Sequence, residues 1–354
     1  MAGELSVWER ELVVPRRPSA AIGGVVKSRA SDFVVTERPL YQPSGDGDHL
    51  YLSVRAVGLP HDVMVRRLAE LVGLPAGLVR TAGIKDRTAI TRQWVSLPTG
   101  RTVAPGDLGD GLEILAVSRH GNGLKIGHLT GNRFDLVVRD VASDAADQVQ
   151  SAIGQLSNRF ANGFGPQRFG RELTTLRRGL ALLANGGDQS LSKSARRFAL
   201  NAVQSGVFNA TLKDRIEAGT ATIVLDGDVI GFPNRGGVFV ATDPAAEQLR
   251  VDAGETVITG PLPGAKSKRA AGLAATLEAA AVARLGLAPD SLDPFRSFVP
   301  GTRRPLIVSP VWHRIEMCDS NLQLSFDLPA GSYATEVVRQ FGALPQTDSE
   351  KPPT

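Results

Sequence analysis

The residues from His49 to Val57 alternate between apolar and polar side chains. This two-residue period predicts a strand with one buried face and one face in solvent. After Asp62 the apolar residues recur at helical spacing instead, which predicts a helix capped by Asp62 and stopped at Gly73. The residues expected on the buried stripe of this helix are Val65, Leu68, Leu71 and Val72.

Strands and helices alternate along the rest of the chain. Short runs rich in β-branched and aromatic residues predict strands over 24–27, 32–37, 112–117, 124–126 and 134–138. A helix is expected to begin near Ser143. Beyond Gly163 the pattern changes, and long helices are expected over 173–185, 193–218 and 272–285. Strand patterns return over 306–308, 312–317 and 322–326, before a last helix over 333–341. This mixture predicts an α+β fold.

The order of these patterns predicts the domain organisation. Strand-rich sequence lies on both sides of the helix-rich stretch, so we expect a discontinuous core of residues 21–162 and 306–342, with a mixed or antiparallel sheet. An inserted α/β domain is expected over 163–305. Residues 1–20 are expected to form an irregular arm, and the polar end of the chain, 343–354, is expected to be disordered.

Composition narrows the class of protein. Of the 354 residues 42% are hydrophobic and 21% are charged, a balance typical of globular domains. No apolar run reaches the length of a membrane span, and Cys318 is the only cysteine. We therefore expect a cytoplasmic protein without disulfides, an interpretation that the polar N-terminus without a signal-peptide pattern also favours. The five histidines lack metal-ligand spacing, so no metal or other cofactor is expected. A monomer is compatible with the sequence.

The net charge of +4 and the sequence pI of about 9.4 permit a nucleic-acid partner without requiring one. A candidate for chemistry lies in the loop from Thr81 to Ala89, where Asp86 sits between Lys85 and Arg87. A carboxylate held beside fixed positive charge stays ionised, so it can act as a nucleophile. A solvated turn is the alternative interpretation for such a triplet.

Four further motifs each allow a structural interpretation when taken alone. GNRF (131–134) fits a turn into a strand, and NGFGPQRFG (162–170) fits a loop packed by two aromatic rings. PGTRRPLIV (300–308) fits a basic turn before a strand. LPAGSYATEVVRQ (328–340) fits a helix start with Ser332 as its cap, where backbone N–H groups could also receive a phosphate.

Taken together and in this order, the motifs resemble those of the TruD family of tRNA pseudouridine synthases. The string AGIKDRTAITRQWVSL resembles the family's catalytic-aspartate motif, and FGPQRFG is the second specific match. DFVVTE (32–37) and PSGDGDHLYL (43–52) extend the likeness from about Val25 to Phe341. The resemblance implies a pseudouridine synthase core with an inserted TRUD domain, tRNA as the partner, and no cofactor.

The resemblance also implies the reaction and its residues. Members of the family isomerise uridine to pseudouridine, in bacteria usually at position 13 in the D-arm of glutamate tRNA. Carried over to this sequence, Asp86 is the nucleophile. Substrate-binding roles fall on Phe33, Asn132 and Tyr333, with Phe134 as a stacking platform and Lys27 as a cation near the carboxylate. For Phe33 and Phe134, packing in the core is the alternative role.

Three other functions are compatible with parts of this pattern. The enzyme could act on another RNA uridine, or the chain could be an RNA-binding or RNA-folding protein with secondary activity. A nucleosidase or glycosidase is disfavoured, because such enzymes usually need a second carboxylate or an activated water. For an RNA enzyme, Arg168, Arg303 and Arg304 at the two crossings between domains are expected to contact phosphates.

Overall fold

The computed structural model describes Leu12, Val14, Pro15 and residues 20–86, 88–185, 190–233 and 235–345. These residues divide into two compact units. The core unit holds residues 20–158 and 309–345, and the inserted unit holds 159–308 with Leu12, Val14 and Pro15. The sequence placed these breaks after 162 and before 306. Most of the predicted N-terminal arm lies outside the described residues.

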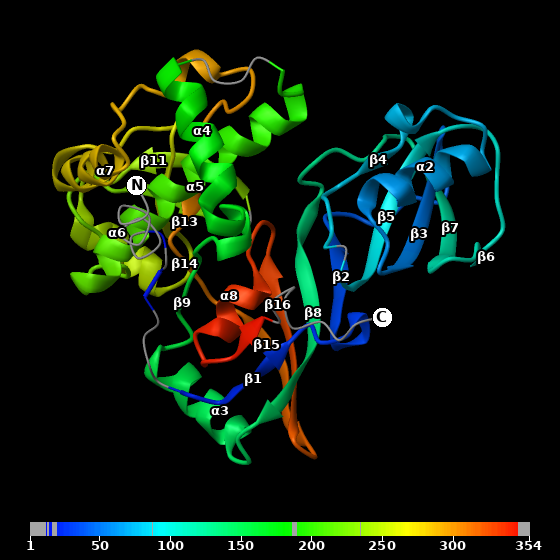
Figure 1. Ribbon diagram of the computed structural model, residues 1–354, viewed down its shortest axis with the longest axis horizontal. Helices are drawn as coiled ribbons and strands as arrows, with labels where there is room; N and C mark the ends of the chain where they lie inside the picture. Colours follow the sequence, from blue (N-terminus) through cyan, green and yellow to red (C-terminus); the bar gives the residue numbers. More distant parts are fainter. Residues whose placement is uncertain are drawn as a thin grey trace. The chain divides into compact units, whose positions relative to one another are not determined.

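The core unit is built on one mixed sheet of eleven strands (Figure 1). The strands are β1 (Gly23–Val26), β2 (Phe33–Pro39), β3 (His49–Val57), β4 (Arg80–Thr81), β5 (Ile90–Pro98), β6 (Gly106–Asp107), β7 (Leu112–His120), β8 (Leu129–Val141), β15 (Val311–Cys318), β16 (Asn321–Pro329) and β17 (Leu344–Pro345). The main order is β15-β16-β8-β2-β5-β3-β7-β6. Only β2 with β5 and β1 with β17 pair in parallel among the described strands.

Three helices accompany this sheet: α2 (His61–Leu71), α3 (Ala145–Gln155) and α8 (Ala334–Arg339). The apolar face of β3 is buried as the alternation predicts, and α2 covers it (Figure 1). The predicted stripe of α2 was wrong in part. The helix begins at His61 with Pro60 as its N-cap, so Met64, Leu68 and Val72 face the core, while Leu71 is 42% exposed.

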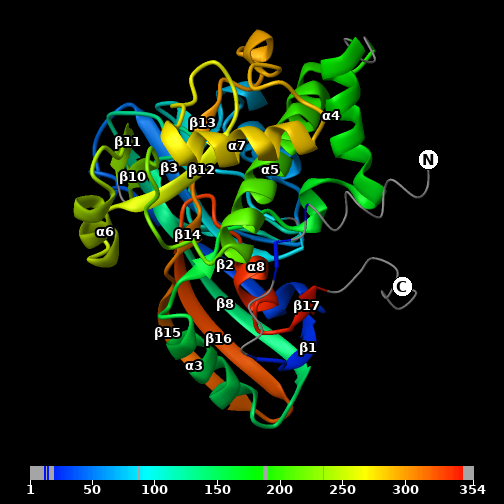
Figure 2. The same ribbon diagram turned by 90° about the vertical axis from the view of Figure 1, so that its left-hand side faces the viewer.

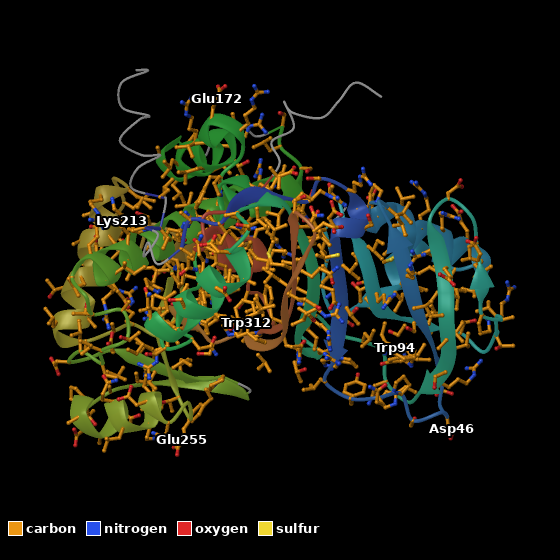
Figure 3. The ribbon with its side chains drawn as sticks, turned by 90° about the horizontal axis from the view of Figure 1, so that it is seen from below. Asp46, Trp94, Glu172, Lys213, Glu255 and Trp312 are labelled. Carbon is orange, nitrogen blue, oxygen red and sulfur yellow. The ribbon has the colours of Figure 1, made fainter. Side chains whose placement is uncertain are left out.

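The long strand β8 connects the two sequence segments of the core unit. It pairs with β2 on one side and with β16 on the other, and Phe134 lies opposite Val35 and Phe326 at the same level. Trp312, labelled in Figure 3, packs its ring 4.7 Å from that of Phe326 and donates a hydrogen bond to Asn158. The C-terminal segment is therefore part of the same core as residues 20–158.

The inserted unit combines short sheets with long helices. Its strands are β9 (Phe160–Ala161), β10 (Val229–Phe232), β11 (Arg235–Val240), β12 (Val257–Leu262), β13 (Thr302–Pro305) and β14 (Ile307–Val308). Its α-helices are α4 (Thr174–Asn185), α5 (Lys193–Glu217), α6 (Pro244–Asp252) and α7 (Gly272–Arg284). The strands β11-β10-β12-β13 form an antiparallel sheet. In Figure 2 the long helix α5 runs beside α7.

Close packing explains how α5 becomes the centre of this unit. A Cβ on Gly260 of β12 would lie about 3.0 Å from the ring of Phe208, and a Cβ on Gly179 would lie 2.3 Å from the carbonyl oxygen of Ala199. Glycine at these positions lets β12 and α4 approach the helix. Leu12 and Val14 are buried in the same core, and Asn209 donates a hydrogen bond to the Leu12 carbonyl.

Several sequence predictions fail for physical reasons. The segment 124–126 is not a strand; Leu124 is buried but Ile126 is 90% exposed, in a turn between β7 and β8. Helix α6 and strand β12 were not predicted. The tail was expected to be disordered from residue 343, yet Ala343 is buried and β17 pairs with β1. Residues 346–354 lie outside the described residues. The predicted α+β class is confirmed.

Candidate active site

The Asp86 loop joins β4 to β5, and both of its ends are fixed. β4 pairs with β5 in the register Arg80–Ser96 and Thr81–Val95, so the chain leaves the sheet and returns to it beside itself. The carbonyl of Ala82 accepts a hydrogen bond from Gly127. The side chain of Asp86 keeps 37% of its surface exposed, and its Oδ1 accepts a hydrogen bond of 3.0 Å from the Thr88 N–H. A carboxylate on this loop is held in place yet open to a substrate.

Among the described residues, Lys27 is a cation that contacts Asp86. Its Nζ forms an ion pair with Oδ2 of Asp86, although the two residues are 59 positions apart. Lys27 follows β1 and has a φ of +65°, a left-handed conformation that is uncommon for a residue with a side chain. Its ammonium also lies 4.2 Å from the ring centroid of Phe33. The buried stem and the ring hold the ammonium, so that Asp86 meets a fixed positive charge.

Lys85 has a different partner from the one that its place beside Asp86 suggests. Its Nζ lies 2.9 Å from Oε2 of Glu37 and 2.9 Å from Oδ1 of Asn132. The side chains of Lys85 and Glu37 are 7% and 1% exposed, so this is a buried ion pair. The expectation that Lys85 and Arg87 flank the carboxylate was wrong for Lys85, and Arg87 lies outside the described residues.

Glu37 is the site residue that the sequence analysis missed. Its signal was present in β2, where Phe33, Val35 and Glu37 alternate and all three are buried. A carboxylate on the inward side of a strand is costly unless it is paired. Besides Lys85, the Glu37 carboxylate accepts a long hydrogen bond of 3.4 Å from the Trp94 N–H. An acidic residue that continues a buried stripe therefore indicates a buried partner elsewhere in the chain.

The two predicted phenylalanines form a packed aromatic layer. The ring centroids of Phe33 and Phe134 are 6.0 Å apart, and Phe326 extends the row at 5.9 Å from Phe134. Phe33 is 3% exposed and Phe134 is 6% exposed. A stacked base needs an open ring face, so this burial favours the packing alternative for Phe134. Phe33 in turn supports Lys27.

Tyr333 comes to this region by strand register. β16 pairs Leu328 with Asn132 and ends at Pro329, four residues before Tyr333. Tyr333 is 41% exposed and occupies the N-cap of α8. The predicted cap at Ser332 was wrong: its N–H donates to the Pro329 carbonyl, and α8 has only six residues. A phosphate cradle at this helix start is therefore not supported.

The predicted phosphate contacts of Arg303 and Arg304 were also wrong. Arg303 makes two contacts with the carboxylate of Glu278, at 2.6 and 2.9 Å, and its side chain is 2% exposed. Arg304 donates to the carbonyl and side-chain oxygens of Asn162, and its guanidinium lies 4.3 Å from the Phe164 ring. Both arginines are structural, because their donors are directed into the inserted unit.

Two further findings concern the described residues as a whole. No helix among them is long and apolar enough to cross a membrane. Within the same ranges, no three His, Cys, Asp or Glu side chains converge as a metal site would require.

His61, at the start of α2, has its pKa lowered by burial. The carboxylate of Asp62 opposes this shift, and the positive charge of Lys85 adds to it.

The chain is similar to known proteins over most of its length. A family model described as tRNA pseudouridine synthase D (TruD) matches residues 17–188 and 183–341. A protein named tRNA pseudouridine synthase D from Anaeromyxobacter sp. (strain Fw109-5) is 37% identical over 343 residues, which cover 93% of this chain and 96% of that protein. The protein of the same name from Anaeromyxobacter dehalogenans (strain 2CP-C) is 36% identical over 336 residues, covering 93% and 95%.

A solved structure also shares the fold. The crystal structure of the putative tRNA pseudouridine synthase D from Methanosarcina mazei superimposes with a TM-score of 0.72 and covers 94% of this chain and 97% of that one. The sequence identity of that pair is 21%, so this comparison concerns the fold alone.

Proposed function

The chain belongs to the TruD family of tRNA pseudouridine synthases, and on that premise we propose that Asp86 is the nucleophile of the isomerisation. We further propose that the target is the uridine at position 13 in the D-arm of glutamate tRNA, the usual target in the bacterial members that the motifs resemble. The reaction would take place in the cytoplasm, with the folded tRNA.

The reaction requires three changes at one nucleoside. The N-glycosidic bond breaks, the uracil turns, and a bond forms between C5 of the base and C1′ of the ribose. C5 loses its proton and N1 gains one, so no atom is gained or lost overall. Bond cleavage develops positive charge at C1′, which a carboxylate can trap or stabilise, as in glycoside hydrolysis. Attack of the carboxylate on the uracil ring is the second route to the same product.

The observation that carries the proposal is the environment of Asp86. Its carboxylate is partly open to solvent, while Lys27 and the Thr88 N–H hold it in one orientation. An ammonium beside a carboxylate favours the ionised form, which is the nucleophilic one. The buried Lys85–Glu37 pair then fixes the residue next to it in the loop, and Asn132 with it. Preorganisation of this kind keeps the nucleophile ready without a metal.

A flipped uridine is needed, because a stacked base conceals its C1′ and its ring edge. Extrusion of a base costs about a few kcal/mol. Tyr333, with 41% of its surface exposed, is the predicted site residue whose aromatic ring is open enough to stack on such a base. Stacking on one aromatic ring recovers about 1–3 kcal/mol. We propose that Tyr333 stacks on the flipped uracil in this way, while Phe33, packed against Phe134, supports Lys27.

The test is pseudouridine formation by Asp86→Asn and Asp86→Ala on unmodified tRNA, in excess EDTA with the tRNA folded by monovalent salt. We expect both variants to lose about 10³–10⁶ in rate, and we expect the wild type to remain active in EDTA. Asp147→Asn is the matched control, because Asp147 is an exposed carboxylate on α3 of the same unit. Activity of either Asp86 variant within tenfold of wild type would overturn the assignment.

The proposed position is tested separately. Pseudouridine is mapped in the total tRNA of cells with and without the gene. A site in the D-arm of glutamate tRNA that disappears with the gene supports the proposal. Loss of pseudouridine only at other uridines would leave the enzyme class in place and refute the proposed target.

A further inference from the structure

We propose that the inserted unit carries a second nucleotide site, a recess beside Phe198 that holds one unpaired base of the RNA. All of its residues belong to the inserted unit, and none belongs to the Asp86 site. The inference rests on the proposed function only in that the substrate is RNA. It concerns recognition of the RNA, whereas Asp86 concerns the chemistry.

The recess lies between helix α5, the loop after β9 and the turn before β13. Its volume is about 230 Å³, and it is lined by Phe164, Arg168, Asn201, Gln204, Gly301 and Thr302 among others. That volume equals the liquid volume of about eight water molecules, which suits a single base rather than a paired stem. The wall is mainly apolar, with a few neutral polar side chains and one guanidinium.

Phe198 supplies an exposed aromatic face beside this recess. Its side chain is 49% exposed, although the residues that follow it on α5 are largely buried. Asn201 and Ser205 lie three and seven residues further along, so the three side chains share one face of the helix. Packing of the helix does not account for a large apolar ring left open next to this recess.

Arg168 links the ring to the recess. Its guanidinium lies 5.7 Å from the ring centroid of Phe198, and its Nε donates a hydrogen bond of 2.9 Å to Oγ of Ser205. Ser205 in turn donates to the carbonyl of Asn201 at 2.8 Å. The guanidinium plane is therefore fixed beside the ring. Aromatic rings and arginine planes are the surfaces on which proteins stack unpaired RNA bases.

Two amide side chains in the recess can read the edge of a base. Within the described ranges the side chain of Asn201 makes no hydrogen bond, so both its donor and its acceptor are available. Gln204 is 7% exposed, and its Nε2 donates to the Pro263 carbonyl at 2.6 Å, which fixes the orientation of its Oε1. An amide carries both donors and an acceptor, the combination that matches base edges.

Cations near this face suit the phosphates of the same strand. Arg197 precedes Phe198 and lies one turn before Asn201, and Lys193 lies one turn earlier again. Both are exposed, and neither forms an ion pair in the described part of the chain. Contacts to phosphates position a nucleic acid, whereas contacts to bases determine which sequence is bound.

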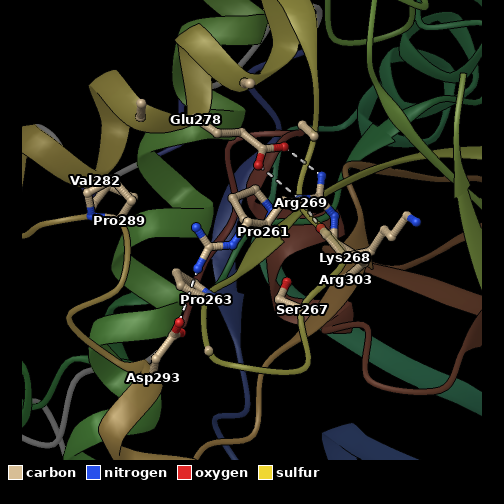
Figure 4. A pocket seen from close by; sticks show the side chains of 14 residues that line it. Pro261, Pro263, Ser267, Lys268, Arg269, Glu278, Val282, Pro289, Asp293 and Arg303 are labelled. Carbon is tan, nitrogen blue, oxygen red and sulfur yellow. Dashed lines mark hydrogen bonds and ion pairs between the residues drawn. The ribbon is translucent and has the colours of Figure 1, made fainter. Parts of the chain in front are cut away.

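A second cavity in the same unit offers a contrast (Figure 4). It measures about 240 Å³ and lies between α7 and the loop before it. Four of its five charged side chains pair with one another: Arg303 contacts Glu278, and Arg269 lies 3.0 Å from Asp293, while Lys268 forms no ion pair among the described residues. Most of the charge in this cavity is therefore already paired. The recess beside Phe198 differs in its unpaired amide and exposed ring.

The test measures the Kd for tRNA of Phe198→Ala and Phe198→Tyr, each placed in an Asp86→Asn background so that no chemistry occurs. Stacking worth about 1–3 kcal/mol predicts that Phe198→Ala weakens binding by about 5- to 140-fold. Phe198→Tyr keeps a flat ring and should bind within about threefold. Leu249→Ala on α6 is the control, because Leu249 is an exposed apolar residue of the same unit, at 73%. Its binding should not change.

A photocrosslinking residue at position 198 locates the base. We expect crosslinks to one unpaired nucleotide of the tRNA, and we expect Asn201→Asp to change the preference for the base at that position. Binding of Phe198→Ala within twofold, equal losses in Leu249→Ala, or crosslinks confined to paired stems would overturn the proposal. Failure of the Asp86 assignment would appear instead as catalysis by the Asp86→Asn enzyme, so the two failures are distinguishable.

Discussion

The buried ion pair between Lys85 and Glu37 allows a quantitative prediction about how the site is held. Lys85→Met removes the ammonium and leaves the Glu37 carboxylate, whose side chain is 1% exposed, without its cation. Removing one partner of a buried pair costs about 3–5 kcal/mol, because the remaining charge is desolvated and unpaired. For a domain of 150–250 residues that loss lowers Tm by roughly 6–20 °C.

A second variant separates stability from positioning. In Lys85→Met/Glu37→Gln no buried charge remains, so most of the lost stability should return. Asn132 still lacks its donor, which in the wild type is the Lys85 ammonium at 2.9 Å. We therefore expect the double variant to stay slow in pseudouridine formation at saturating tRNA, even at a temperature where it is fully folded.

The measurements are thermal unfolding followed by circular dichroism and single-turnover pseudouridine formation at 25 °C. Lys125→Met is the control, since Lys125 is exposed in the same unit and should change stability by no more than about 0.5 kcal/mol. A Tm of Lys85→Met within 2 °C of wild type would refute the buried-pair reasoning. Full activity of the folded double variant would show that Lys85 supports only the fold.

Two further predictions concern Phe134 and His61. Phe134→Ala should destabilise the protein by about 3–5 kcal/mol and Phe134→Leu by less than about 1.5 kcal/mol, because a core ring mainly fills volume. If folded Phe134→Leu instead loses as much kcat as Phe134→Ala does, the ring has a stacking role. Burial lowers the pKa of His61, so the unfolded chain binds a proton there more readily than the folded chain does. The free energy of unfolding is therefore highest above about pH 6.5 and falls as the pH drops below that value. Urea unfolding between pH 5 and 8 should show a smaller loss in His61→Gln, and identical pH profiles would contradict the reasoning.

The local patterns of the sequence predicted much of the core unit. Period-two alternation located β3, and the β-branched run after Asp32 located β2. The segment 124–126 was predicted as a strand because apolar residues flank a polar turn there. Whether this segment is buried depends on the path of the chain between β7 and β8 rather than on its own composition. Helix α6 was missed because only partly buried residues, without a buried stripe, face the unit from it.

Local sequence patterns could not predict which charged residues form ion pairs with one another. Lys85 adjoins Asp86 in the chain but binds Glu37 on β2, whereas Asp86 forms an ion pair with Lys27, which follows β1, a strand paired with β8. The family resemblance, unlike the local pattern, did indicate Lys27 as a cation near the carboxylate. The basic residues Arg303 and Arg304 were predicted to contact phosphates, but both side chains point inward and stabilise the inserted unit.

The ion pairs of Lys85 with Glu37 and of Lys27 with Asp86 have different consequences for the proposed mechanism. Asp86 and Lys85 are neighbours on one loop, so any shift of Lys85 also moves the proposed nucleophile. Lys27, a cation that contacts Asp86, follows a separate strand, β1. Two different ion pairs thus act on this loop, a buried one at Lys85 and a partly exposed one at Asp86. We therefore expect changes at Lys85 to alter rates mainly through the position of the loop, and changes at Lys27 to alter them through its direct contact with the carboxylate.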